Sequence, residues 1–381
     1  MAKKAYIGVD GVAKAVKKGY VGIDGVARRI KKAYIGIGGV ARPCWSGGEL
    51  AYYGTVTNLS QARWRCAATS VGNYALFGGG YDRSIFISSV EVYNKSLTKS
   101  EVGQGLSVAR YDLAATTVGG YALFAGGSYN VNSSGIVVDV VDAYDESLTR
   151  STPTPLQATR SYMCATTVGD YALFCGGSGD YTDAYNKSLT RSIPKSFGKI
   201  TYYLASTMIG DYALFGGGSD PDITTAAVYS YNKSLTLTQL PEASALSQKR
   251  SSLGATTVGS HALFGGGSDA NAYGKYSTVD SYDMSLARSV LDGLSVARGY
   301  LSATTVGDYA VFGGGRTLKN GSPTYSAAVD AYDVQLTHTI QTDLNIPRDH
   351  VYAATVGSYA LFAGGFGSGN TVYNTVDAFT V

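Results

Sequence analysis

Apolar and polar residues alternate in a pattern that recurs seven times along the chain. One copy, residues 165–177, reads ATTVGDYALFCGG. Its segments Ala165–Val168 and Tyr171–Phe174 are rich in apolar, β-branched and aromatic residues, which predicts two short strands. Gly169 and Asp170 between them suit a two-residue turn, whose central residues need a positive φ. Each copy is therefore predicted to form a β-hairpin followed by a double glycine.

The copies are evenly spaced, and each is followed by two further strand signals. The phenylalanine near the end of the second strand recurs at intervals of 41 to 50 residues, at Phe77, Phe124, Phe174, Phe215, Phe264, Phe312 and Phe362. A single hairpin cannot bury its apolar face in water, whereas stacked copies bury one another. Repeats of this length with four strands each are typical of β-propellers. We therefore predict an all-β fold with seven four-stranded blades.

The seventh copy ends one strand short. Its last residues, Thr375–Val381, match the third strand of the other copies, while residues 51–63 resemble their fourth strands. We expect the segment after residue 50 to complete the last blade, because this closes the ring and removes its open sheet edges. The propeller is accordingly assigned to residues 51–381, with a linker at residues 43–50.

Residues 1–42 carry a different repeat, of 14 residues. Its copies, KKAYIGVDGVAKAV, KKGYVGIDGVARRI and KKAYIGIGGVAR, each contain a central Asp-Gly or Gly-Gly, which is a strong hairpin signal. Two strands are too few for an independent fold. We expect this segment to dock on a larger body or to self-associate, and a homotrimer around one axis is a natural arrangement.

Charge is distributed unevenly along the chain. Ten Lys and Arg and two Asp give residues 1–42 a net charge of +8, so the other residues carry −5 of the overall +3. The basic side chains either bind an anionic surface or keep thin strands soluble. We prefer the second interpretation and do not expect a nucleic-acid partner. No apolar run approaches the roughly 20 residues of a membrane helix, and no signal peptide is apparent.

The sequence contains no recognisable motif for catalysis, metal binding or cofactor binding. Its three histidines are scattered, its four cysteines lack metal-ligand spacing, and its glycine runs follow strands without a helix behind them. We therefore predict no catalytic, metal or cofactor site and expect the protein not to be an enzyme. Cys164 and Cys175 face each other across the predicted hairpin, at a hydrogen-bonded position whose wider Cα separation favours two thiols over a disulfide.

The two ends of the predicted blades differ in how much their sequences vary. Turns at one end are nearly uniform, whereas loops at the other end differ in length and chemistry. Binding residues usually lie on loops that a rigid frame holds, and tyrosine among small polar residues suits recognition. The alternative is that the loop sequences vary because nothing constrains them. We predict ligand contacts on this loop face from Tyr81, Tyr129, Tyr181, Tyr273, Tyr276 and Tyr325.

An arginine precedes the first strand of six copies at one fixed offset, and Thr201 takes this position in the fourth. The six are Arg63, Arg110, Arg160, Arg250, Arg298 and Arg348. Because the innermost strands line a propeller's channel, these guanidinium groups are candidates to circle its mouth and bind carboxylate or phosphate. The other interpretation is that they tie the loop to carbonyl groups of the neighbouring blade. The sequence leaves both roles open.

A glycine pair after the second strand, followed by an acidic residue and a tyrosine in the third, resembles the kelch repeat. Gly126 and Gly127 with Asp142 and Tyr144 are one example. The resemblance covers residues 51–381 and implies a kelch-like propeller, but it implies little about function. Kelch repeats usually place a tryptophan after the tyrosine. This chain has a leucine four residues later, such as Leu148, so we expect leucine at the contacts between blades.

The repeats of residues 3–45, ahead of a recognition domain, resemble tail-associated proteins of phages and prophages of Gram-positive bacteria. This resemblance implies a non-enzymatic receptor-binding protein that is made in the bacterial cytoplasm and resides in the virion tail. Its loop face would bind a carbohydrate or protein of the host surface, and residues 1–42 would contact other tail proteins. The alternatives are a kelch-like enzyme that acts on glycans, of epimerase or lyase type, and an intracellular scaffold for protein interactions.

Overall fold

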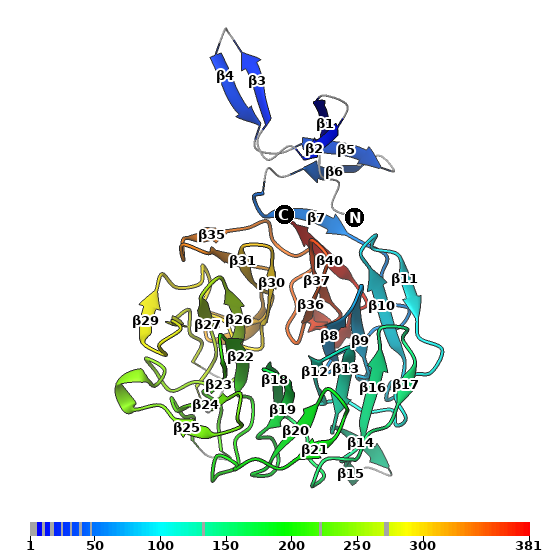
Figure 1. Cartoon of the computed structure of the whole chain (residues 1–381), viewed down its shortest axis with the longest axis vertical. Coiled ribbons are helices and arrows are strands. Elements are labelled where there is room, and N and C mark those ends of the chain that lie inside the picture. The colour runs from blue at the N-terminus through cyan, green and yellow to red at the C-terminus, as the bar shows by residue number, and fades with distance from the viewer. Residues whose placement is uncertain are drawn as a thin grey trace.

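The structure is a computed structural model that describes residues 48–131, 134–220, 223–269 and 274–381, together with six strands between residues 6 and 45. Seven antiparallel sheets of four strands are arranged as blades around a central axis (Figure 1), and the described residues contain almost no helix. The prediction of an all-β propeller with seven blades is confirmed.

The strands of each blade follow one another from the channel outward. The innermost strands are β8 (Ala67–Val71), β12 (Ala114–Val118), β18 (Cys164–Val168), β22 (Ala205–Ile209), β26 (Gly254–Val258), β30 (Ser302–Val306) and β36 (Tyr352–Val356). The second strands are β9 (Tyr74–Gly78), β13 (Tyr121–Ala125), β19 (Tyr171–Cys175), β23 (Tyr212–Gly216), β27 (His261–Gly265), β31 (Tyr309–Gly313) and β37 (Tyr359–Ala363). The third strands are β10 (Val90–Asn94), β16 (Val141–Asp145), β20 (Thr182–Asn186), β24 (Val228–Asn232), β28 (Val279–Tyr282), β34 (Val329–Asp333) and β40 (Val376–Thr380).

The outermost strands are short, and small elements occupy some of the loops. The outermost strands are β11 (Lys99–Glu101), β17 (Arg150–Ser151), β21 (Arg191–Ser192), β25 (Leu237–Gln239), β29 (Arg288–Leu291), β35 (His338–Ile340) and β7 (Ala51–Thr55). Loop hairpins are formed by β14 (Ser128–Val131) with β15 (Ser134–Val137), β32 (Arg316–Lys319) with β33 (Ser322–Tyr325), and β38 (Phe366–Gly367) with β39 (Thr371–Val372). Two single-turn 3₁₀ helices are η1 (Glu242–Ser244) and η2 (Ser368–Asn370).

The N-terminal repeats form three separate two-stranded sheets, as their turn signals predict. The pairs are β1 (Tyr6–Val9) with β2 (Val12–Ala15), β3 (Gly19–Ile23) with β4 (Val26–Ile30), and β5 (Ala33–Ile37) with β6 (Val40–Trp45). The sequence pattern thus predicts one hairpin for each copy of the 14-residue repeat, and the structure has one hairpin for each copy.

The ring closes where the sequence analysis expects it to close. Strand β7, from the N-terminal side of the propeller, pairs antiparallel with β40 at the outer edge of the seventh blade. In Figure 1 the two strands lie side by side although they come from opposite ends of the chain. Closure of this kind joins the first blade to the last and leaves no open face between them.

Hydroxyl groups of the innermost strands join neighbouring blades around the channel. The second threonine of the repeated ATTV motif donates a hydrogen bond to the backbone carbonyl of its counterpart in the preceding blade, as Thr167 does to Thr117. Ser70 of the first blade donates to the carbonyl of Thr355 in the seventh, which continues the series across the closure. The motif is therefore repeated because it links the blades, as well as because it forms strands.

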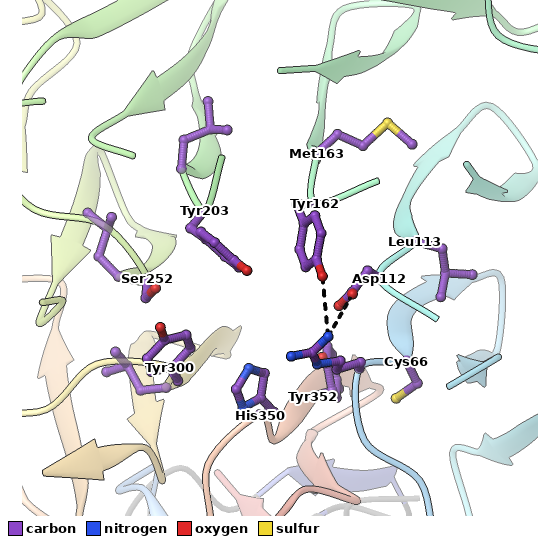
Figure 2. A pocket seen from close by; sticks show the side chains of 14 residues that line it. Cys66, Asp112, Leu113, Tyr162, Met163, Tyr203, Ser252, Tyr300, His350 and Tyr352 are labelled. Atoms are coloured by element: carbon purple, nitrogen blue, oxygen red, sulfur yellow. Dashed lines mark hydrogen bonds and ion pairs between the residues drawn. The ribbon is translucent and has the colours of Figure 1, made fainter. Parts of the chain in front are cut away.

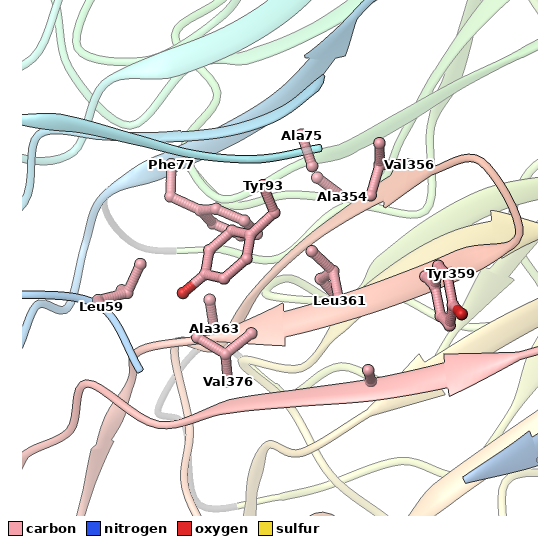
Figure 3. Close-up of a cluster of buried hydrophobic side chains, with 11 residues drawn as sticks. Leu59, Ala75, Phe77, Tyr93, Ala354, Val356, Tyr359, Leu361, Ala363 and Val376 are labelled. Carbon is pink, nitrogen blue, oxygen red and sulfur yellow. The ribbon is translucent and has the colours of Figure 1, made fainter. Parts of the chain in front are cut away.

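The apolar core is divided into clusters that each span two adjacent blades. Figure 3 shows the cluster in which Phe77 and Tyr93 of the first blade pack against Leu361 and Val376 of the seventh. The two rings meet edge to face, with their centroids 6.0 Å apart, a favourable arrangement for aromatic pairs. Leu97 packs against the same cluster, so the expected leucine contact between blades is present beside the aromatic one.

The double glycine after the second strand is a backbone requirement. The N–H of Gly127 in the second blade donates to the carbonyl of Arg160 in the third, at 2.9 Å. Gly127 has a φ of +105°, and a Cβ atom there would lie 2.7 Å from the carbonyl oxygen of Tyr111. Only glycine fits a left-handed conformation with so little space.

The arginines that precede the innermost strands are buried inside the blades, not exposed around the channel mouth. All six side chains have no solvent-accessible surface. In the sixth blade, Arg298 Nη2 lies 2.6 Å from Asp330 Oδ2 and donates to the carbonyl of Phe312. Asp330 also accepts from the N–H of Ser295 at 2.9 Å and bonds His338 at 2.7 Å. A buried ion pair needs such additional partners to offset its desolvation.

This placement corrects the predicted ligand-binding role of the ring. The guanidinium groups of Arg63, Arg110, Arg160, Arg250, Arg298 and Arg348 each pair with a carboxylate of their own blade, from Glu91, Asp142, Asp183, Asp280, Asp330 and Asp377 respectively. They have no surface left for a ligand. The sequence alone could not distinguish the two roles, because an arginine at a constant offset suits both of them.

The fourth blade replaces the ion pair as a unit. Thr201 stands where the other blades have arginine, and Tyr229 stands opposite Phe215, where they have the carboxylate. The ring of Phe197 stacks on Tyr229 with a centroid separation of 4.4 Å. Leucine occupies the position of Phe197 in the other blades, for example Leu246. All three residues change together because a lone buried charge is far more costly than none.

We predict that Arg250→Thr lowers the free energy of unfolding by about 3–5 kcal/mol, because the buried Asp280 then keeps only the more exposed Arg288 as a charged partner. The triple variant Leu246→Phe, Arg250→Thr, Asp280→Tyr reproduces the fourth blade and should be more stable than the single variant. Urea unfolding of the three proteins measures the difference. A triple variant no more stable than Arg250→Thr would contradict the view that the three residues form one unit.

Candidate ligand-binding site at the channel mouth

A cavity of about 210 Å³ lies where the loops enter the innermost strands. Each blade contributes the residue two positions after its arginine or, in the fourth blade, after Thr201. These seven residues, here called the mouth ring, are Arg65, Asp112, Tyr162, Tyr203, Ser252, Tyr300 and His350. Figure 2 shows side chains of the ring from different blades pointing toward one shared space.

Backbone hydrogen bonds connect the mouth ring from blade to blade. The N–H of Asp112 donates to the carbonyl of Arg65 at 2.9 Å, and the N–H of Tyr162 donates to Asp112 at 3.1 Å. Three more N–H groups donate to the backbone carbonyl of the preceding ring residue at 2.8 to 3.0 Å: Ser252 to Tyr203, Tyr300 to Ser252 and His350 to Tyr300. The positions of these side chains are therefore set by the ring as a whole and not by one flexible loop.

All seven residues of the mouth ring have a left-handed backbone, with φ between 47° and 57°. Glycine adopts this conformation without strain, whereas other residues lose about 1–2 kcal/mol. None of the seven is glycine, and they differ among themselves although the arginine before them is nearly constant. The backbone therefore does not explain which residues stand here. Strained residues with particular side chains cluster at functional sites.

One side of the cavity is polar. Arg65 Nη1 lies 3.1 Å from Asp112 Oδ2 and 3.3 Å from the hydroxyl oxygen of Tyr162. Burial disfavours the Asp112 carboxylate and raises its pKa, although the neighbouring Arg65 acts in the opposite direction. This wall offers both hydrogen-bond donors and acceptors in a setting with little water, where such bonds are strong.

The other side of the cavity is aromatic. The rings of His350 and Tyr300 are stacked, with their centroids 4.8 Å apart. His350 Nδ1 lies 2.9 Å from the fully buried Asp349, whose second oxygen accepts from Arg316 at 2.6 Å. Burial raises the pKa of Tyr203, whose ring also belongs to the cavity wall, to about 12.

Two polar atoms at the cavity have no hydrogen-bond partner among the described residues: Arg65 Nε and Ser252 Oγ. Buried polar atoms in native proteins are nearly always satisfied, by protein, water or ligand. Arg65 is nevertheless well positioned, because its Cζ lies 4.5 Å from the ring centroid of Trp64 and 5.8 Å from that of Tyr111. The cavity thus presents unused hydrogen-bonding capacity on a fixed scaffold.

The mouth ring escaped the sequence analysis, which selected residues two positions away. The signal was present, because two variable positions follow a near-constant one. The copies read RWR, RYD, RSY, TYY, RSS, RGY and RDH. Which of these positions faces the axis depends on the left-handed backbone there. The repeat pattern alone does not predict that left-handed conformation.

The five described loop tyrosines that were predicted as ligand contacts do not line this cavity. Tyr81, Tyr129, Tyr276 and Tyr325 are half-buried, and Tyr181 is exposed. Tyr273 lies outside the described residues. Tyr81 and Tyr325 contact other aromatic rings of the loop face. A ligand contact of these residues stays a prediction.

Three cysteines, Cys66, Cys164 and Cys175, are free thiols. Cys164 and Cys175 are paired in register across the hairpin and are not bonded to each other, as the sequence analysis expects. Cys66 lines the cavity, and burial raises the pKa of its thiol to about 12, which makes it a poor nucleophile at neutral pH. Within the described residues, no three His, Cys, Asp or Glu side chains are grouped to hold a metal ion, and no helix is long and apolar enough to span a membrane.

We predict a pH-dependent stability difference between the natural protein and Asp112→Asn. The folded state binds the Asp112 proton more tightly than the unfolded chain, so this group favours folding at low pH. That contribution is lost as the pH rises from the ordinary value of 3.8 through the higher folded pKa. Relative to Asp112→Asn, the natural protein should therefore become less stable over this range.

Thermal unfolding at several pH values measures this difference. Arg65→Met should widen the affected pH range, because it removes the charge that opposes the upward shift of the Asp112 pKa. Parallel curves for the natural protein and Asp112→Asn would contradict the prediction.

Comparisons with known proteins support the fold and do not name a family. No family profile matches the chain, and no curated protein sequence matches it. Among solved structures, one titled "Structure of YjhT" is similar, with a TM-score of 0.57 over 75% of this chain and 99% of its own. The two sequences are 13% identical, so the likeness shows a shared propeller fold and nothing about ligand or activity.

Proposed function

We propose that this is a non-enzymatic recognition protein and that its mouth ring binds one sugar unit of a carbohydrate on a host cell surface. The proposal depends on one observation above all. Seven chemically different side chains converge on one cavity, and each stands at a strained position of an otherwise repeated frame. A propeller supplies the rigid frame that such a binding site needs.

The chemistry of the cavity fits a sugar. A pyranose ring has faces of C–H groups that pack on aromatic rings and hydroxyl groups that each donate and accept hydrogen bonds. Tyr300 and His350 supply the aromatic wall, while Arg65, Asp112 and Ser252 supply polar partners. The volume of 210 Å³ is below the ~300–1,000 Å³ of pockets for drug-sized ligands, which suits a single ring.

The setting on a phage tail is the more specific part of the proposal. It is supported by the resemblance of residues 3–45 to tail-associated repeats and by the hairpins found there. In this setting the hairpins contact other tail proteins and hold several copies together, three being the natural number. A weak site for one sugar then gains avidity, because linked sites can strengthen binding by about 10²–10⁴-fold.

We predict that Tyr203→Ala lowers carbohydrate affinity about tenfold or more, because it removes a ring and a hydroxyl group from the cavity wall. A glycan array and binding to whole bacterial cells measure the effect. Ile340→Ala is the control, since this exposed residue lies on the outermost strand β35 and does not line the cavity. Equal binding by the natural protein and Tyr203→Ala would contradict the assignment of the binding site to this cavity.

One observation favours the enzyme alternative. His350, oriented by Asp349, and Asp112, whose pKa is raised by burial, face the same cavity, as a general base and a general acid would. Incubation of a sugar found on the array, followed by NMR, separates the two functions. A changed anomer or a cleaved product that disappears in His350→Gln would replace recognition with catalysis on glycans.

A further inference from the structure

We propose that the cavity holds the end unit of a longer carbohydrate chain, and that the following units lie over an aromatic surface on the first and second blades. This surface, here called the aromatic platform, consists of Tyr81, Phe86 and Tyr111. The inference rests on the proposed function and adds that the ligand is an oligosaccharide bound by its terminus, with a stated direction across the loop face.

The platform is a compact cluster of three rings that all contact one another. Tyr81 and Phe86 are stacked with centroids 4.9 Å apart and planes 20° apart, and Phe86 and Tyr111 are stacked at 5.5 Å and 18°. All three side chains are partly exposed. Aromatic rings arranged in this way give a large, stiff contact surface with little conformational entropy to lose.

The platform is continuous with the cavity. Tyr111 directly precedes Asp112 of the mouth ring, and its ring centroid lies 5.8 Å from Arg65 Cζ. Arg65 belongs to the cavity wall. A ligand that leaves the cavity beside Arg65 and Asp112 therefore meets Tyr111 first and Phe86 next.

The repeated frame does not require these aromatic residues. Tyr81 follows the double glycine of the first blade, where the next four blades have serine: Ser128, Ser178, Ser219 and Ser268. Tyr111 follows its arginine directly, where the third, fifth and sixth blades have Ser161, Ser251 and Gly299, although the first and fourth blades are also aromatic there. Small residues fulfil the backbone role at both positions. Both positions are aromatic only on the two sides of the first blade, where Trp64 stacks on Phe366 at 4.8 Å and Tyr111 lies 5.9 Å from Tyr81. The aromatic residues therefore break the symmetry around this blade, as a binding site does.

The loop that carries Phe86 is held in shape before any ligand arrives. Asp82 Oδ1 accepts hydrogen bonds from the N–H groups of Ser84 and Ile85, both at 2.8 Å, which closes a tight turn. Tyr81 and Phe86 on either side of the turn form an antiparallel bridge. A site that is already ordered loses less entropy on binding.

Polar groups flank the platform, as hydroxyl-rich units require. Gln61 Nε2 lies 3.2 Å from Asp82 Oδ2 beside it, and Asn130 Oδ1 lies 3.5 Å from the Tyr111 hydroxyl. These amides and carboxylates can hydrogen-bond the rims of sugar rings whose faces lie on aromatic side chains.

The test compares sugars of one and four units. Calorimetry of the full-length protein uses matched pairs: N-acetylglucosamine and its β-1,4-linked tetramer, glucose and maltotetraose, and mannose and its α-linked tetramer. The variants are Phe86→Ala with Tyr111→Ala, as a double variant, and Tyr203→Ala in the cavity. Ile340→Ala is again the control, and melting temperatures report the fold of each variant.

We expect the natural protein to bind one tetramer at least tenfold more tightly than the corresponding monosaccharide. The double variant should lose this advantage and keep the affinity for the monosaccharide, while Tyr203→Ala weakens both. A tetramer that binds no more tightly than its monosaccharide overturns the inference and leaves the proposed function standing. If the double variant still binds the tetramer more tightly than the monosaccharide by the same factor, the inference is also overturned and the proposed function stands. If none of the six sugars binds, both are overturned.

Discussion

A buried arginine–carboxylate pair fixes the place where the chain enters six of the seven blades. The side chain of Arg298 holds carbonyl groups and Asp330 of its own blade, while its backbone carbonyl accepts the N–H of Gly267 in the blade before it. One residue thus anchors both the loop and the contact between blades. Because the pair is buried and hydrogen-bonded to the backbone, it holds the loop in place, and the residue two positions later is held at the channel axis.

The mouth ring depends on this constraint. A side chain at a left-handed residue can be directed reliably into a cavity only if the surrounding backbone cannot relax. The hydrogen bonds from Tyr300 to Ser252 and from His350 to Tyr300 show how each blade restrains its neighbour. The repeated backbone places one residue of every blade at the cavity in the same way, and the side chains of these seven residues determine which ligand can bind. A change of ligand would therefore require substitutions in the ring and few elsewhere.

The fourth blade shows that the anchor is a physical unit and not a fixed motif. Phe197, Thr201 and Tyr229 fill the space of a leucine, an arginine and a carboxylate, and Tyr203 still takes its place in the mouth ring. The stacked rings of Phe197 and Tyr229 stabilise this blade where the other blades have an ion pair. The contact between blades survives as well, since Gly177 still donates to the carbonyl of Thr201.

The sequence by itself determined the propeller, the number of blades and the closure by residues 51–55, because these follow from local periodicity and from a copy that lacks one strand. It also determined the facing thiols of Cys164 and Cys175, because hairpin register follows from the turn. It did not distinguish the buried Arg298 from the half-buried Tyr300, two residues later. That choice is made by the sign of φ at Tyr300 and by seven loops that meet at one axis. Both arise from contacts between blades far apart in the chain, and only the tertiary structure contains them.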